Sequence, residues 1–373
     1  MAANPQPPPA TDAGTVRAWC PGRVTLIGDH TDYAEGVSLA LAVDLGTEVT
    51  LAGDPAAASV ACTSDAAPGS AAIDLDVPLD PQALRAMQPA WTRYVAAVVA
   101  TVRPPVGGRA AVRSSLPVGA GLSSSASLCV AAALAFGLEG DPLTVARTCQ
   151  RAEQAATGVD VGLLDPWALT AATPGAACLL DFRTGLARTV PMPADAEVVV
   201  VHSGQQRSLD RSGYQARRAE CDAAAYRLGP LGHVEPEAVL GLPDPVLRRR
   251  ARHVVTECDR VRWFVEALDR HDLAEAGRLM LASHRSLADD FEVSTPVLDG
   301  LVARLSAMPG VHGARLTGAG FGGCVVALAE PGAIDFRELR GPAWRVSAAG
   351  GARLVTAGDA PDGDAPRPTG ERG

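Results

Sequence analysis

The sequence has no lysine: all 33 basic residues among its 373 are arginine. This absence excludes a Schiff-base lysine, a phosphate loop of the Gly-Lys-Ser/Thr type and the strand lysine of protein kinases. A phosphate site in this chain must instead use backbone N–H groups, hydroxyls, arginine and a metal ion. We attribute the missing lysine itself to a GC-rich genome.

Long apolar runs and a surplus of positive charge are also missing. The apolar stretches are interrupted well before 18 residues, and residues 1–14 are rich in proline and alanine rather than basic and then apolar. We therefore expect neither a transmembrane helix nor a signal peptide. The formal net charge of −9 argues against binding to nucleic acid or to an anionic membrane, but it leaves room for a local positive site that binds an anionic ligand.

The eight cysteines form no Cys-x-x-Cys pair and no cluster with histidine. They are dispersed and mostly lie among apolar residues, as small buried side chains do. This pattern indicates reduced cysteines in a cytoplasmic protein and argues against structural zinc.

The order of apolar patterns predicts an α+β protein rather than repeated βαβ units. Strands are expected at residues 23–28, 38–43, 47–52, 59–63, 71–77, 109–115, 176–182, 197–202, 313–317, 324–329 and 344–348. Helical periodicity predicts helices at residues 91–102, 124–136, 143–157, 214–228, 245–270, 272–291 and 296–308.

The length leaves room for two domains. Residues 1–14 and 358–373 are rich in proline and in glycine or alanine, so both are predicted to be disordered tails. Between them we expect an N-terminal domain over 15–195 and a C-terminal domain over 196–357, with a soft boundary near residue 195 and no long linker.

Residues 117–127 carry the most informative pattern. Gly119 and Gly121 allow a tight turn, three serines follow, and an apolar helix-forming run occupies residues 128–134. A helix that begins at about Ser124 presents unpaired N–H groups and its positive dipole end, which together bind phosphate well. The alternative is a glycine-rich turn that is capped by serine.

A second polar cluster follows the strand predicted at residues 23–28. Asp29, His30 and Asp32 lie within four residues and can hydrogen-bond several hydroxyls of a polyol, because carboxylates accept and histidine can donate or accept. The alternative is an Asx-rich turn after a strand.

Glu153 and Asp165 form the third constellation. Glu153 is near the end of a predicted helix, where the dipole disfavours a carboxylate, so a cation such as Mg²⁺ would explain it. Asp165 precedes Pro166, and proline is common at the first position of a helix. Asp165 is therefore either the N-cap of that helix, a catalytic group or both.

The fourth constellation is the glycine-rich stretch at residues 314–324, between two predicted strands. Four glycines in six residues let the backbone approach a ligand closely. A hairpin turn with a bulge is the alternative.

These four segments together resemble the GHMP small-molecule kinases, in the order found along this chain. The run Gly-Arg-Val-x-Leu-Ile-Gly-x-His-Thr-Asp-Tyr at residues 22–33 is similar to the sugar-binding signature of the galactokinases. Pro-x-Gly-x-Gly-Leu-Ser-Ser-Ser-Ala at 117–126 resembles the ATP loop of the GHMP kinases, and Leu-Thr-Gly-x-Gly-Phe-Gly-Gly-Cys at 316–324 resembles their third motif. Similarity extends to residues 91–94 and to Arg207 and the helix start at 214–218, and it covers about residues 17–350.

The resemblance implies the two-domain GHMP kinase fold, with the active site in the cleft between the domains. It implies an ATP- and Mg²⁺-dependent kinase that phosphorylates the anomeric hydroxyl of galactose. Asp165 becomes the catalytic base and Arg23 its partner, while Ser124 and Glu153 become the magnesium ligands.

The remaining site residues carry over in the same way. Those expected on the ATP side are Trp91, Gly119, Gly121, Ser123 and Ser124. Those expected to contact the sugar are Asp29, His30, Asp32, Gly162 and Tyr214.

Three positions depart from the family pattern. Asp29 stands where the family usually has glutamate, Thr25 where it has asparagine, and Pro166 where it has glutamine. The first shortens a sugar contact by a methylene group, and the third removes an N–H and is expected to hold Asp165 in an extended conformation.

Two other functions are weighed against galactose phosphorylation. One is a GHMP kinase that acts on another sugar, a sugar acid or a polyol, which Asp29 favours. The other is a galactokinase-like sensor that binds sugar and ATP without turnover, which the intact loop, Arg23, Glu153 and Asp165 disfavour. We expect a cytoplasmic protein, monomeric and without nucleic-acid or membrane partners.

Overall fold

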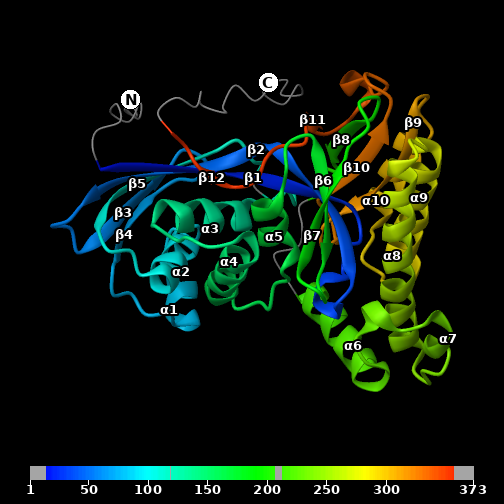
Figure 1. Ribbon diagram of the computed structural model, residues 1–373, viewed down its shortest axis with the longest axis horizontal. Helices are drawn as coiled ribbons and strands as arrows, with labels where there is room; N and C mark the ends of the chain where they lie inside the picture. Colours follow the sequence, from blue (N-terminus) through cyan, green and yellow to red (C-terminus); the bar gives the residue numbers. More distant parts are fainter. Residues whose placement is uncertain (1–13, 118, 206–211, 357–373) are drawn as a thin grey trace.

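The structure is a computed structural model that describes residues 14–117, 119–205 and 212–356. The predicted tails, apart from Gly14 itself, and Arg207 lie outside the described residues. Two sheets and the helices packed on them give the α+β class that the sequence predicts (Figure 1).

The larger sheet has eight strands: β1 (Thr15–Ile27), β2 (Val37–Asp54), β3 (Ser59–Ser64), β4 (Ser70–Asp74), β5 (Gly107–Ser114), β6 (Ala176–Asp181), β7 (Leu186–Pro191) and β12 (Arg353–Leu354). Its order is β12-β1-β2-β5-β3-β4, and β6 and β7 continue from β2. The smaller sheet has the order β11-β8-β10-β9 and is built from β8 (Glu197–His202), β9 (Val311–Thr317), β10 (Cys324–Ala329) and β11 (Ala343–Val346). The pairing is antiparallel except between β3 and β5.

The helices are α1 (Pro81–Ala86), α2 (Thr92–Val102), α3 (Ser124–Ala135), α4 (Pro142–Thr157), α5 (Leu164–Ala171), α6 (Ser212–Leu228), α7 (Pro236–Val239), α8 (Pro245–Asp269), α9 (Leu273–Asp289) and α10 (Pro296–Ser306). Figure 1 shows α2, α3 and α4 on one side of the larger sheet, and α8, α9 and α10 beside the smaller one. Asp141 and Asp244 begin α4 and α8, because each carboxylate accepts hydrogen bonds from first-turn N–H groups and a proline follows.

Two large hydrophobic clusters fix the position of helix α3 relative to the two sheets. One joins both sheets and includes Leu26 of β1, Val200 of β8 and Phe264 of α8. The other lies between the larger sheet and α2, α3 and α4, and includes Cys129 and Cys149. Helix α3 is buried on nearly all sides, and this packing holds its N-terminus in place next to the loop that precedes the helix.

Several element boundaries differ from the prediction. The runs at 38–43 and 47–52 are one strand, β2, and β1 begins at Thr15 rather than at residue 23. Strand β7 was not predicted, because four consecutive exposed residues leave no alternation to detect.

All eight cysteines are buried thiols. Over the three described ranges, no helix is both long enough and apolar enough to cross a bilayer.

Candidate active site

A cavity of about 600 Å³ lies where the two halves of the chain meet. Its walls contain every site residue that the sequence predicted: Arg23, Asp29, His30, Asp32, Trp91, Gly119, Gly121, Ser123, Ser124, Glu153, Gly162, Asp165 and Tyr214. The glycine-rich loop between β9 and β10 also lines it, through residues 318–321. That loop is the hairpin connection between the antiparallel strands β9 and β10, and its approach to a ligand stays a prediction.

Helix α3 begins at Ser124, as the sequence predicts. Ser123 occupies the N-cap position with a φ of +61°, but its side chain makes no capping hydrogen bond. The interpretation of this segment as a serine-capped turn is therefore wrong. The first N–H groups of α3 are left for a ligand, and phosphate suits such a helix start.

Asp165 is held by two donors. Nη2 of Arg23 lies 2.5 Å from its Oδ1, and the hydroxyl of Ser123 donates to its Oδ2 across 2.7 Å. Arg23 is 4% exposed, also donates to the carbonyl of Gly121 at 2.7 Å, and has a buried Nε without a partner among the described residues. One guanidinium thus ties the carboxylate to the phosphate loop.

The expected backbone of Asp165 is corrected by the structure. Helix α5 begins at Leu164, so Asp165 is helical, and the N-cap is Leu163 rather than Asp165. Pro166 is the third helical residue, a position whose N–H makes no intrahelical hydrogen bond. The helix therefore accepts a proline there, although a residue before proline usually prefers an extended backbone. Asp165 is therefore not a cap, and its carboxylate faces Arg23 and Ser123.

Glu153 lies in the last turns of α4 and is 7% exposed. Its Oε1 accepts a hydrogen bond from the hydroxyl of Ser125 at 2.6 Å. The sequence motif points to Ser124 and not to Ser125, because only the position of α4 decides which hydroxyl of the serine run meets the carboxylate. Ser125 also lines the cavity.

The carboxylate of Glu153 and the neighbouring serine hydroxyls fit Mg²⁺, which prefers oxygen ligands and usually keeps water and phosphate ligands as well. Across the described parts of the chain, no three His, Cys, Asp or Glu side chains gather as a metal-binding group. A cation here would therefore take part of its coordination from nucleotide phosphates and water.

Asp32 also lines the cavity and accepts a hydrogen bond from the N–H of Leu164 at 3.2 Å. Desolvation by burial raises the pKa of Asp32 to about 6. A Cβ on Gly162 would lie 1.7 Å from its Oδ2, so the glycine gives the carboxylate its room.

His30 lies among aromatic rings. Its ring centroid is 5.8 Å from that of Tyr214 and 4.6 Å from that of Phe291. Nδ1 is 3.0 Å from the hydroxyl of Tyr33, and Nε2 is 3.2 Å from the carbonyl oxygen of Ala319. The imidazole therefore links the turn after β1 to the β9–β10 loop.

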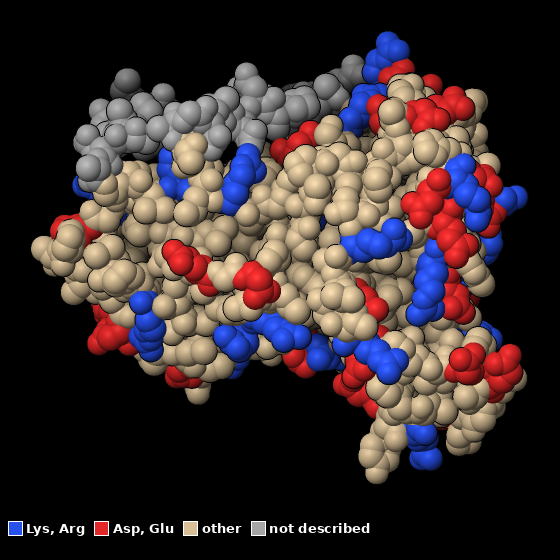
Figure 2. All heavy atoms as spheres, in the orientation of Figure 1, with Lys and Arg blue, Asp and Glu red and all other residues tan. Residues whose placement is uncertain are grey.

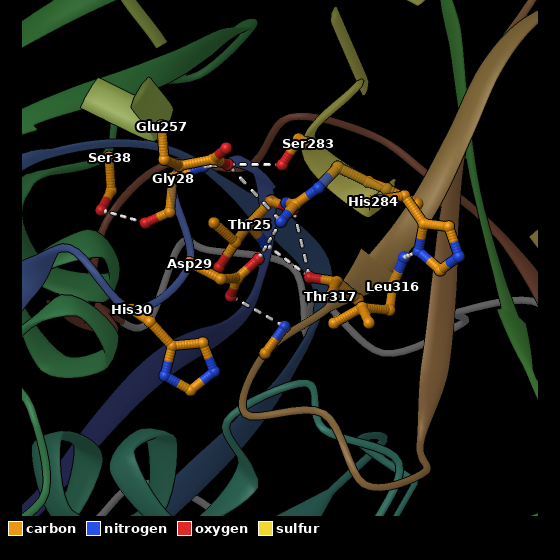
Figure 3. A network of polar contacts seen from close by, with 12 residues as sticks. Thr25, Gly28, Asp29, His30, Ser38, Glu257, Ser283, His284, Leu316 and Thr317 are labelled. Atoms are coloured by element: carbon orange, nitrogen blue, oxygen red, sulfur yellow. Dashed lines mark hydrogen bonds and ion pairs between the residues drawn. The ribbon is translucent and has the colours of Figure 1, made fainter. Parts of the chain in front are cut away.

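Asp29 is 2% exposed and makes contacts that the sequence did not predict (Figure 3). Its Oδ2 pairs with Nη2 of Arg315 at 2.7 Å, and its Oδ1 accepts from the N–H of Gly318 at 2.9 Å. Thr25 is anchored nearby, because its N–H donates to the hydroxyl oxygen of Thr317 at 2.9 Å. The carboxylate of Asp29 is therefore occupied by β9 and the loop, and is not part of a local Asx turn.

The far end of the cavity is less polar. Trp91 stands at the start of α2, and its indole N–H donates to the carbonyl of Pro68 at 3.3 Å. Tyr94, Val112 and Leu128 line the same cavity. Such an apolar slot beside an anion site suits a flat heterocyclic base.

The chain matches three family models: "Galactokinase galactose-binding signature" over residues 10–52, "GHMP kinases N terminal domain" over 90–172 and "GHMP kinases C terminal" over 264–338. It is 40% identical over 328 residues to galactokinase of Homo sapiens, covering 84% of this chain and 83% of that one. It is 40% identical over 331 residues to galactokinase of Mycobacterium tuberculosis (strain ATCC 25618 / H37Rv), covering 84% and 89%.

Two solved structures are similar. Galactokinase of Lactococcus lactis complexed with galactose has a TM-score of 0.83 and 28% identity, covering 91% of this chain and 95% of that one. The mevalonate kinase of Methanococcus jannaschii has a TM-score of 0.64 and 17% identity, covering 91% and 100%, and shares the fold. The chain belongs to the galactokinase family of the GHMP kinases.

Proposed function

We propose that this protein is a kinase that transfers the γ-phosphoryl group of ATP to the anomeric hydroxyl of galactose and releases ADP and galactose 1-phosphate. The observation that carries the proposal is the place of Asp165. Its carboxylate is fixed by Arg23 and Ser123 beside the uncapped start of α3, so a proton acceptor adjoins a phosphate site.

In this mechanism Asp165 takes the proton of the sugar hydroxyl, or orients that hydroxyl, as its oxygen bonds to the γ-phosphorus. The bond from that phosphorus to the bridging oxygen of ADP breaks. Arg23 and the N–H groups at the start of α3 stabilise the charge on the phosphoryl oxygens, which is most of what phosphoryl transfer requires. These groups replace the lysine that the chain lacks.

We place Mg²⁺ beside Glu153, with the hydroxyls of Ser124 and Ser125 as the nearby donors. These residues would hold the ion, and its charge would offset the negative charge of the nucleotide phosphates. Glu153 and Ser125 are already in contact at 2.6 Å, which supports a shared role. The base of ATP is assigned to the slot that contains Trp91.

The charges on the sugar side favour a neutral sugar over a sugar acid. Asp32 and Asp165 both line this wall, and Arg23 is already paired with Asp165. A carboxylate on the substrate would be repelled by these two aspartates, and the guanidinium of Arg23 would not be free to neutralise it. Asp29 lends little support to a different substrate, because its carboxylate is ion-paired with Arg315 and accepts a hydrogen bond from the N–H of Gly318.

The cellular setting is part of the proposal. We infer a cytoplasmic monomer with domains over residues 15–195 and 196–357. Eight buried thiols suit a reducing compartment. The face in Figure 2 intersperses basic and acidic side chains, which suits a protein without a polyanionic partner.

A substrate panel tests the proposal. The protein is incubated with MgATP and galactose, glucose, 2-deoxygalactose, galacturonate or mevalonate, and ADP release is measured. Galactose should give the highest kcat/KM, and galacturonate should give little turnover. Faster turnover of another substrate would overturn the sugar assignment, and no turnover of any would overturn the kinase assignment.

A further inference from the structure

The loop between α4 and α5, residues 158–163, forms part of the cavity wall. Val159, Val161 and Gly162 line the cavity, and Gly162 lies against Asp32. The loop contains neither helix nor strand. Its position, and with it the room left for Asp32, therefore depends on contacts from the neighbouring elements.

Helix α4 holds this loop from one side through two glutamines. Gln150 and Gln154 each donate from Nε2 to the carbonyl of Val161 at 3.0 Å. Gln154 also donates to Oδ1 of Asp160 at 2.7 Å. These contacts all lie within the N-terminal half of the chain, so they do not place the loop relative to the other half.

Arg218 of α6 holds the same loop from the C-terminal half. Its Nη1 donates to the carbonyl of Asp160 at 2.5 Å, and its Nη2 lies 2.8 Å from Oδ2 of the same residue. The carbon at the centre of its guanidinium is 5.3 Å from the centroid of the Tyr33 ring. One side chain thus joins the loop to α6 and to the turn after β1.

The neighbours of this contact face the cavity. Among the described residues that line the cavity are Tyr214 and Asp32, but not Arg218 or Asp160. Tyr214 is one helical turn before Arg218 on α6, and its ring meets that of Tyr33 edge-on with the centroids 6.0 Å apart. A shift of Arg218 would therefore move groups that line the cavity, although Arg218 itself lies behind them.

The charge of Arg218 also acts on Asp32. Burial raises the pKa of Asp32 to about 6, and the charge of Asp165 raises it further, whereas hydrogen bonds from backbone N–H groups and the charge of Arg218 lower it. Tyr33 and Tyr214 also face Asp32, and burial raises the pKa of both phenols, so they stay neutral. Removal of Arg218 would thus raise the pKa of Asp32.

We propose that Arg218 is a positioning residue for the sugar, which holds loop 158–163 against α6 through Asp160 without touching the substrate. The cavity wall that it fixes consists of Asp32, Gly162 and Tyr214. The inference rests on the proposed function, because galactose is taken as the ligand of this wall.

Arg218→Met tests the proposal, because methionine keeps an apolar stem beside Tyr33 but removes the charge and both contacts with Asp160. KM for galactose should rise by about tenfold or more, since small displacements of binding groups have effects of this size, while KM for ATP should stay within about twofold. Turnover at saturating galactose should fall less, because Asp165 is held separately by Arg23 and Ser123.

The pH profile separates the charge of Arg218 from its contacts. In Arg218→Met the acid limb of kcat/KM for galactose should move to higher pH, because Asp32 loses a nearby positive charge. Arg218→Lys keeps the charge but cannot reach the carbonyl and the carboxylate of Asp160 together, so KM should rise while the acid limb stays in place. Loss of fold stability alone would not move this limb.

Asp160→Asn tests the partner. Its side chain is 64% exposed, and exposed ion pairs contribute little, so KM for galactose should rise only about two- to fivefold. Combined with Arg218→Met it should add nothing further, because two residues in contact are not additive when one acts through the other. Arg227→Met is the matched control: it replaces an exposed arginine of α6 away from the cavity and should leave both KM values unchanged.

A folded Arg218→Met variant with wild-type KM for galactose would contradict the inference, as would a double variant whose loss is the product of the two single losses. If Arg218→Met does not fold in a thermal melt, Arg218→Lys is judged by the same KM criterion. The wild-type protein, assayed in parallel, tests the proposed function separately. If it does not turn over galactose, the proposed function fails, and Arg218 is judged by the same ratios on the sugar that the panel identifies.

Discussion

Gly162 and Asp32 are in such close contact that no side chain fits between them: a Cβ at position 162 would lie 1.7 Å from Oδ2 of Asp32. The glycine thereby leaves room for a carboxylate in the cavity wall, where Leu164 also donates to it. The sugar-binding role that we propose for Asp32 thus depends on a residue without a side chain.

Gly162→Ala should displace Asp32 and raise KM for galactose by roughly 10- to 200-fold, the range for a mismatch of one methylene in a pocket. Turnover at saturating galactose should fall less. Steady-state kinetics measure both. Gly300→Ala is the control, because a Cβ at Gly300 meets nothing within 4 Å. Unchanged KM in Gly162→Ala would contradict the role given to Asp32.

Asp165→Asn should still fold, because Asp165 is not a helix cap and asparagine fills the same volume, but loss of the ion pair with buried Arg23 should lower Tm. The amide cannot accept a proton, so kcat should fall by on the order of 10²-fold or more, while galactose binding persists. Single-turnover kinetics and calorimetric titration with galactose separate these effects. Wild-type kcat in a folded Asp165→Asn variant would exclude proton transfer to this residue.

The metal assignment predicts a shifted Mg²⁺ titration. Glu153→Gln should need several-fold more Mg²⁺ to reach half-maximal rate, since a neutral amide binds a hard cation less well. Ser124→Ala and Ser125→Ala, compared in the same assay, identify the contributing hydroxyl. The contact of Ser125 with Glu153 leads us to expect the larger shift for Ser125→Ala. Wild-type titration curves for all three variants would refute the site.

Asp32 also predicts a pH dependence. Desolvation raises its pKa from 3.8 to about 6, and the ionised form is needed to accept hydrogen bonds from sugar hydroxyls. kcat/KM for galactose should therefore fall about tenfold per pH unit below pH 6. A profile that stays flat down to pH 5 would contradict this role.

The raised pKa of Asp32 also makes the stability of the protein depend on pH. A carboxyl whose pKa is raised on folding binds its proton more tightly in the folded state, so its contribution to stability decreases as pH rises from about 4 to 6. Asp32→Asn should thus raise Tm relative to wild type more at pH 8 than at pH 4, while galactose binding weakens. Thermal melts at the two pH values measure the difference.

Local sequence patterns predicted most helices and the start of α3, because capping residues and apolar periodicity act over a few neighbouring positions. They did not predict β7, whose exposed side chains carry no alternation. They also misplaced the start of α5, since the preference of a residue before proline was overridden by helix packing.

The motifs identified the site residues and the pairing of Asp165 with Arg23, but not the partners of Glu153 and Asp29. Ser125 and Glu153 are 28 positions apart, and Asp29 is separated from Arg315 by most of the chain. Such pairs arise from the packing of α3 on α4 and of β1 against β9, which no local pattern encodes. The expectation that Asp29 contacts the sugar therefore stays a prediction, and the structure offers Arg315 as its partner.

The most direct test of the account is to locate the transferred phosphate. Protein, MgATP and galactose are incubated together, and the product is examined by phosphorus–proton correlation NMR. We predict a phosphorus resonance coupled to the anomeric proton of galactose, which forms far more slowly when Asp165→Asn replaces the wild-type protein. Coupling to another ring proton, or ATP consumption without a sugar phosphate, would contradict the account.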